Sequence, residues 1–276
     1  MQQLRGGRPH IMMAPSRQHA HFIESDTHLV AGSPPLSGSE GIDLVSFSDR
    51  LLAAVRTFRP SASRIDDVVR LSGGASQETW ALTITTAVQA ERLILRRSSQ
   101  VSAAFDKIEI ETEAALMRAA ESAGVPSPHV HHVIQPDDDF GRGFFMSHVD
   151  GEALGRKIVR DEQFASIRPK LAYQAGEILA RIHSIDPAGL PPLPRIAPAD
   201  EIARLYETYR THSAPRPVFE LAFRRLRDAM PAGDAPMRLV HGDFRNGNML
   251  ITPQGVSAVL DWELAHIGDP MRDLGW

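Results

Sequence analysis

The sequence contains no cysteine, and this absence excludes disulfide bonds and thiolate metal sites. It fits a reducing compartment, and we expect a cytoplasmic protein. Lysine is scarce as well: the basic residues are arginine except for Lys107, Lys157 and Lys170. No apolar run approaches the roughly 20 residues that a membrane-spanning helix needs, so we expect no membrane association.

Charge and length are ordinary for a globular protein. The net charge of −4 gives no reason to expect binding to nucleic acid. The chain has 276 residues, of which 42% are hydrophobic, and this is enough for one large or two small domains. Residues 1–41 are rich in glycine and proline without an apolar period, which predicts a disordered N-terminal tail. Their arginine-rich, acid-poor start leaves a transit peptide as the alternative.

The stretch Leu239–Trp262 carries three oxygen-bearing side chains at spacings that suit phosphoryl transfer: Asp243, Asn248 and Asp261. An amide oxygen and a carboxylate are typical protein ligands of Mg²⁺, which keeps waters and binds substrate phosphates. A second carboxylate, not used for metal, can accept the proton of a hydroxyl that attacks a phosphate.

A predicted hairpin explains how these side chains meet. Met249–Thr252 and Val256–Leu260 have the pattern of short strands, and Pro253–Gly255 between them is typical of a hairpin turn. The hairpin folds the chain back, so Asn248 and Asp261 are expected at the same end of it.

Upstream of this stretch, the apolar period changes from helical to strand-like and back. Leu44–Phe58 has helical spacing and Pro60 ends it, while Phe105–Ser122 predicts a second helix. Ser72–Gln77 is a glycine-rich turn whose backbone N–H groups could approach a phosphate closely. The expected strands are Ile65–Leu71, Glu78–Thr85, Arg92–Arg97, Val130–Ile134 and Gly143–Val149.

From Glu152 onward the pattern is mainly helical. One long helix is expected at Phe164–Ile185, where apolar residues share one face and Pro169 suits the first turn. His183, near its end, is interpreted as a buried, hydrogen-bonded residue in preference to a base. Two further helices are expected at Ala199–His212 and Pro217–Met230.

The central motifs resemble those of a known family. The spacing of Asp243, Asn248 and Asp261 resembles the catalytic and metal-binding loops of protein kinases. HGDFRNGN followed by LDWELAHIGDPMRDLGW is similar to the aminoglycoside phosphotransferase and choline-kinase-like family. It is most similar to the branch whose relatives occur beside acyl-CoA dehydrogenases.

The resemblance implies an α+β, protein-kinase-like fold with two lobes. The small lobe, residues 42–149, would have about five antiparallel strands and one helix and would bind the nucleotide. The large lobe, residues 150–276, would be mainly helical and carry the catalytic hairpin. The implied cofactors are ATP and Mg²⁺. The implied acceptor is a hydroxyl of a small molecule, either a hydroxyacyl thioester or an aminoglycoside-like alcohol.

Residue roles also follow from the resemblance. Asp243 would be the catalytic base, and Asn248 and Asp261 would hold Mg²⁺. His241 would brace the catalytic turn. Arg245 would either touch the γ-phosphate or pair with an acid further along the chain, Asp269 or Asp273.

The nucleotide side is less regular, because Arg96 occupies the position of the family's lysine. Arginine is always charged and can hold phosphate with its fork, although it is bulkier than lysine. Glu113 would pair with Arg96, and a solvated acid is its alternative interpretation. The hinge, Phe145–Val149, would offer backbone groups to the adenine edge. The expected nucleotide-binding residues are Ser72, Gly73, Gly74, Ala75, Ser76, Arg96, Glu113, Met146 and His148.

Two other functions stay open. A metallophosphoesterase also uses GD and GN turns but needs histidine ligands, whereas Met249 follows Asn248 here and Asp26–His28 lies in the tail. A nucleotide-binding pseudokinase or fragment is favoured by Arg96 and by the end of the chain at Trp276. Family members continue with further helices, so we expect a C-terminally truncated chain whose longer version has the full activity.

Overall fold

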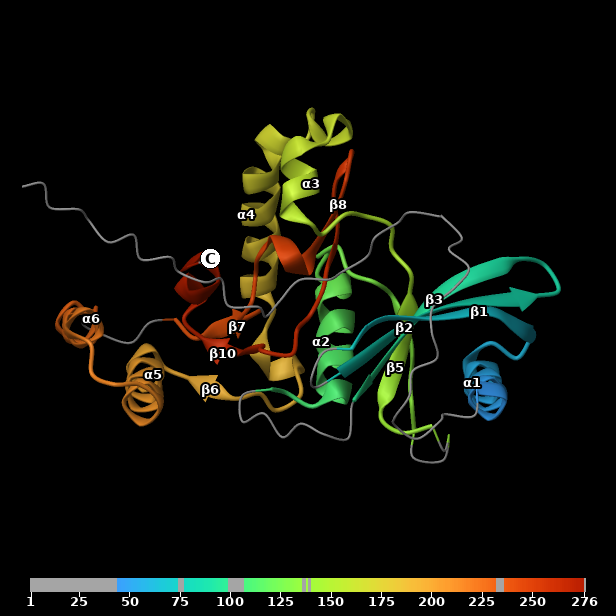
Figure 1. The fold of residues 1–276 in the computed structure, drawn as a ribbon, viewed down its shortest axis with the longest axis horizontal. Coiled ribbons are helices and arrows are strands. Elements are labelled where there is room, and N and C mark those ends of the chain that lie inside the picture. Colours follow the sequence, from blue (N-terminus) through green and yellow to red (C-terminus); the bar gives the residue numbers. More distant parts are fainter. Residues whose placement is uncertain are drawn as a thin grey trace, which may run out of the picture.

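The largest sheet has five antiparallel strands in the order β1-β2-β3-β5-β4 (Figure 1). The computed structural model describes residues 44–73, 77–98, 107–135, 138, 140–231 and 236–275, so the expected tail lies outside the described residues. All five expected strands are present, with slightly different ends. They are β1 (Ala62–Gly73), β2 (Gln77–Thr86), β3 (Ala90–Ser98), β4 (Val130–Val133) and β5 (Gly143–Ser147).

Two helices cover opposite faces of this sheet: α1 (Leu44–Phe58) and α2 (Ile110–Ser122) (Figure 1). Side chains alternate along a strand, and β3 shows the consequence. Leu93 and Leu95 are buried in the cluster with α1, whereas Ile94 is buried in the cluster with α2. The same alternation turns Arg96 toward α2.

The helix α2 begins later than the sequence predicts. It starts at Ile110 and not at Phe105, and Glu109 before it is extended, with φ −63° and ψ 148°. The backbone N–H of Ile108 donates to the carbonyl oxygen of Glu263 at 3.0 Å. A long-range hydrogen bond therefore replaces the local one that would continue the helix backwards.

The second half of the chain is mainly helical. The expected long helix begins at Arg168 and not at Phe164, with Pro169 in its first turn, where a missing N–H is tolerated. The α-helices are α3 (Gly155–Arg160), α4 (Arg168–Ser184), α5 (Pro198–His212) and α6 (Pro217–Asp228). Short 3-10 turns are η2 (Glu162–Phe164), η3 (Pro187–Gly189), η4 (Asn246–Asn248) and η5 (Pro270–Gly275). None of the helices in the described ranges is long and apolar enough to cross a bilayer.

Two small sheets carry the central stretch. The predicted hairpin is confirmed as β8 (Met249–Thr252) and β9 (Gly255–Val259). A three-stranded sheet in the order β6-β10-β7 was not predicted. Its strands have only two or three residues, too few to show an alternating pattern: β6 (Arg195–Ile196), β7 (Arg238–Val240) and β10 (His266–Gly268). Helix α4 packs against β7 and β9, so it supports both ends of the central stretch.

Candidate active site

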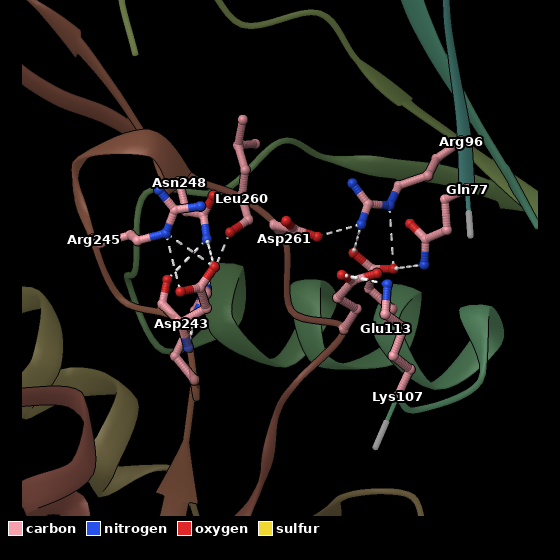
Figure 2. A network of polar contacts seen from close by, with 11 residues as sticks. Gln77, Arg96, Lys107, Glu113, Asp243, Arg245, Asn248, Leu260 and Asp261 are labelled. Carbon is pink, nitrogen blue, oxygen red and sulfur yellow. Dashed lines mark hydrogen bonds and ion pairs between the residues drawn. The ribbon is translucent and has the colours of Figure 1, made fainter. Parts of the chain in front are cut away.

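Asp243, Asn248 and Asp261 lie together where the chain leaves β7, enters β8 and leaves β9 (Figure 2). The Asn248 Nδ2 donates to the backbone oxygen of Asp243 at 2.8 Å and to its Oδ2 at 2.7 Å. Because this amide nitrogen faces Asp243, the amide oxygen of Asn248 faces the other way. Asn248 and Asp261 line one pocket. The convergence expected from the hairpin is therefore present.

A closed ring of hydrogen bonds fixes these groups relative to one another. The His241 Nδ1 accepts from the Asp243 N–H at 3.3 Å, and its Nε2 donates to the Leu260 carbonyl oxygen at 3.1 Å. The Leu260 N–H in turn donates to the backbone carbonyl oxygen of Asn248 at 2.8 Å. This pattern requires a neutral imidazole with its hydrogen on Nε2. Burial lowers the pKa of His241, which favours that neutral form.

The turn at His241–Asp243 is also held by Asp273, which is almost fully buried on η5. Its carboxylate accepts from the N–H of His241 at 3.0 Å, from the N–H of Gly242 at 2.9 Å, and from the His183 Nε2 at 2.9 Å. Burial alone would raise the pKa of Asp273, but these hydrogen bonds outweigh it and lower the pKa. His183 is therefore a hydrogen-bonded partner of Asp273, as expected, and this contact gives no support for a role as a base.

Arg96 reaches the site from β3 and joins two carboxylates (Figure 2). Its Nε donates to Glu113 Oε2 at 3.2 Å, and its Nη2 lies 3.0 Å from Glu113 Oε1 and 2.5 Å from Asp261 Oδ1. Gln77 Nε2 adds a 3.2 Å hydrogen bond to Glu113. Glu113 is fully buried, so its interpretation as a solvated acid is wrong.

The net charge of this centre depends on whether Glu113 is ionised. Burial raises the pKa of Glu113 to about 7; Arg96 works in the opposite direction, and Asp261 adds to the rise. Burial would lower the pKa of Arg96, but the carboxylates outweigh it and raise the pKa. When both acids are ionised, two negative charges share one guanidinium. The excess negative charge would then favour the binding of a further cation.

Asp261 has an unusual backbone. Its φ of +68° is the only positive φ of a non-glycine residue within the described ranges. Aspartate enters this left-handed region more readily than most residues, at a cost of order 1–3 kcal/mol. The conformation directs the carboxylate back toward Arg96 and the pocket. We interpret this conformational cost at Asp261 as the consequence of directing its carboxylate toward Arg96.

Arg245 has a partner that the sequence analysis did not name. Its Nε lies 3.0 Å from Asp243 Oδ1 and 3.2 Å from Oδ2. Residues two positions apart have no regular contact in a turn, so sequence spacing carries no signal for this pair. A guanidinium beside the expected base holds the carboxylate in place together with Asn248.

The pocket beside these groups has an apolar part next to the hinge, formed by side chains of both halves of the chain. Met146 and His148 line it, as do Arg96 and Glu113. The N–H groups of Ser147 and His148 already donate, to the carbonyls of His129 at 2.9 Å and Arg92 at 3.3 Å. An adenine ring bound at the hinge, as expected from the sequence, would therefore need other backbone groups of Phe145–Val149. The apolar lining residues include Leu71, Ile94, Met117, Val149, Leu250 and Leu260.

The glycine-rich turn is described only at its edges. Ser72 and Gly73 form the end of β1, and Gln77 begins β2. Gly74, Ala75 and Ser76 lie outside the described residues.

Comparison with known proteins identifies the family to which the sequence is similar. The sequence profile of the phosphotransferase enzyme family matches residues 67–276. Acyl-CoA dehydrogenase family member 10 of Mus musculus is 28% identical over 220 residues, which are 76% of this chain and 20% of that protein. Acyl-CoA dehydrogenase family member 11 of Homo sapiens is 30% identical over 193 residues, which are 66% of this chain and 24% of that protein. The chain thus spans less than a third of these relatives.

Solved structures confirm the protein-kinase-like fold that the sequence predicted. Aminoglycoside phosphotransferase APH(4)-Ia, as a thermostable mutant with ADP and hygromycin B, aligns with a TM-score of 0.57 and 16% identity, covering 83% of this chain and 75% of that one. The type I macrolide 2'-phosphotransferase aligns with a TM-score of 0.53 and 17% identity, covering 87% and 77%. At such identities the likeness shows the fold.

Gly242→Ala should unfold the catalytic turn locally and lower the melting temperature. Gly242 has φ +85°, and an added Cβ would lie 2.4 Å from the Leu264 carbonyl oxygen. Gly176→Ala in α4 is the matched control, because a Cβ there meets nothing within 4 Å and alanine favours a helix interior by about 0.5–1 kcal/mol. Thermal unfolding should show a decrease for the first variant and an increase for the second. Equal melting temperatures for Gly242→Ala and the parent would contradict the packing.

Asp273→Asn should destabilise the protein at pH 7 by about 1.5–3 kcal/mol, typical of hydrogen bonds to a charged group. A lowered folded-state pKa contributes stability above the ordinary aspartate pKa of about 3.9, and this contribution is lost as the pH falls through the folded value. The gap between parent and variant in urea unfolding should therefore be largest near pH 7 and shrink below about pH 4. A gap that grows on acidification would refute the assignment. Asp228→Asn, at an exposed position, is the control.

Proposed function

The chain belongs to the phosphotransferase enzyme family, and from this membership we propose that it transfers the γ-phosphate of ATP to a hydroxyl of a small molecule. The observation that carries the proposal is the convergence of Asp243, Asn248 and Asp261. Asn248 and Asp261 line one pocket, and a ring of hydrogen bonds ties Asn248 to Asp243 and to Leu260, the residue before Asp261. Arg96 faces the same pocket from the sheet. A base, a cation site and a phosphate anchor are thus within one preorganised centre.

Asp243 is proposed as the base. Arg245 and Asn248 hold its carboxylate oxygens, so its orientation is set before a substrate binds. The acceptor oxygen would attack the γ-phosphorus, its proton would pass to Asp243, and the bond to the leaving ADP oxygen would break. Since phosphoryl transfer needs little covalent help from a protein, positioning of the acceptor is the main task of this residue.

Asn248 and Asp261 fit a Mg²⁺ site. The amide oxygen of Asn248 is turned away from Asp243, and Asp261 offers a carboxylate on the same pocket. One amide and one carboxylate, with waters and phosphates completing the shell, suit this hard cation. When bound, Mg²⁺ would neutralise the charge of the phosphates.

Arg96 is proposed to anchor phosphate through its Nη1, the guanidinium nitrogen that does not contact Glu113 or Asp261. Its Nε and Nη2 are engaged by these acids. The role of Glu113 is then to fix the guanidinium plane. Arginine supports this arrangement better than lysine, because a planar fork can hold two carboxylates and still present a further donor.

The acceptor class is proposed from the kinds of molecule named for similar proteins. The structural neighbours are aminoglycoside and macrolide phosphotransferases, and the sequence relatives are acyl-CoA dehydrogenase family members. We propose a small alcohol, with a hydroxyacyl thioester and an aminoglycoside-like alcohol as the classes to screen. Phosphorylation of a metabolite panel, read by mass spectrometry, tests this.

A nucleotide-binding protein without transfer activity is the second candidate. It is favoured by one observation: Asp261, the proposed metal ligand, is already paired with Arg96. Consumption of ATP that depends on Mg²⁺ separates the two candidates. Family membership removes the metallophosphoesterase alternative.

Asp243→Asn should lower the turnover rate by about 10²-fold or more, the range of general-base contributions, while ATP affinity stays near that of the parent. The amide is isosteric and cannot accept the hydroxyl proton. Turnover with the identified acceptor and calorimetric titration with ATP measure the two quantities. Glu207→Gln, an exposed residue of α5, is the control and should leave both unchanged. Turnover of Asp243→Asn near the parental rate would remove the base assignment.

A further inference from the structure

Glu263 holds the segment that leads into α2 by two separate contacts. Its Oε1 lies 2.8 Å from the Lys107 Nζ, and its carbonyl oxygen accepts the N–H of Ile108 at 3.0 Å. Both side chains of the ion pair are mostly shielded, with exposed fractions of 28% for Lys107 and 18% for Glu263. Two contacts from one residue to two consecutive residues make a defined link and not a chance approach of surface charges.

This link runs beside the Arg96 centre. Glu263 is two residues beyond Asp261, and Lys107 is three residues before the start of α2, which carries Glu113. The same two segments are therefore joined twice, once through Arg96 and once through Lys107 (Figure 2). Lys107 belongs to a loop before a helix, so the second link determines where the first turn of α2 lies.

The charges explain why a cation is needed at Lys107. Glu113 and Asp261 already share the single guanidinium of Arg96, and Glu263 brings a further carboxylate to the neighbourhood. Without Lys107, the negative charge of Glu263 would repel Glu113 and Asp261, the two acids that Arg96 holds. Lysine is rare in this chain, with three instances, and one of them lies here.

We propose that Lys107 and Glu263 form a positioning pair that holds α2, and with it Glu113 and Arg96, in register with Asp261 for nucleotide binding. The effect on nucleotide rests on the proposed function; the effect on α2 does not. If the pair is instead an ordinary partly exposed salt bridge, its loss changes neither the nucleotide affinity nor the position of α2.

The test uses the full chain and four variants: Lys107→Met, Glu263→Gln, the charge swap of Lys107→Glu with Glu263→Lys, and Arg142→Met. The last is the matched control, because Arg142 pairs with Glu109 and Glu111 at the start of the same helix but does so from the side of β5. The backbone contact of Ile108 is kept in all of them. The probe is the Mg²⁺ complex of a non-hydrolysable ATP analogue, with affinity measured by calorimetry.

Lys107→Met and Glu263→Gln should each weaken binding by about fivefold or more, and the charge swap should restore affinity to within about twofold of the parent. Arg142→Met should stay within about twofold. The proposal is overturned if the single variants bind like the parent, if Arg142→Met weakens binding as much, or if the swap fails to recover affinity.

Hydrogen exchange separates this proposal from the proposed function. The amides of residues 108–113 should exchange faster in Lys107→Met and Glu263→Gln and return to the parental rate in the swap. If the parent binds no nucleotide analogue, the proposed function fails, and exchange alone decides whether the pair positions α2. Unchanged exchange in both single variants would overturn the pair in either case.

Discussion

The candidate site depends on one shared guanidinium. Arg96 reaches out of the five-stranded sheet and is held by Glu113 of α2 and by Asp261 at the end of the β8-β9 hairpin. The burial of this ion cluster is unfavourable unless each charge keeps a partner, so the sheet, the helix and the hairpin must arrive together. A single side chain thereby couples the two halves of the chain. When Glu113 is ionised, two carboxylates share one guanidinium, and this excess of negative charge is the physical reason to expect a further cation.

The turn at His241–Asp243 is held in another way, by buried side chains that bind backbone groups. His241 bridges the turn to the strand before Asp261, and Asp273 accepts from two successive N–H groups of the turn. Because His241 and Asp273 are buried, these hydrogen bonds fix the turn, and with it Asp243, before any substrate arrives. Gly242 adopts its positive φ without steric cost, whereas the positive φ of Asp261 shows that the chain accepts local strain to keep this geometry.

Much of this could be predicted from the sequence, because the decisive patterns are local. The apolar pattern predicted the individual strands, the family resemblance predicted their assembly into one antiparallel sheet, and the hairpin signal brought Asn248 and Asp261 together. Apart from the Arg245–Asp243 pair, the contacts that were missed join residues far apart in the chain. Asp273 holds a turn about thirty residues upstream, and Glu263 reaches the entry of α2, which is why that helix starts later than its periodicity suggests. Strands of two or three residues, such as β6, carry no readable period.

We propose that this pocket binds a magnesium nucleotide through Asn248, Asp261 and Arg96, and a crystal structure with Mg²⁺ and a non-hydrolysable ATP analogue is the decisive experiment. We expect a metal ion bound by the Asn248 amide oxygen and an Asp261 carboxylate oxygen, with Arg96 in contact with a phosphate and Asp243 facing the γ-phosphate. A nucleotide bound elsewhere, or a metal ion held without Asn248 and Asp261, would contradict it.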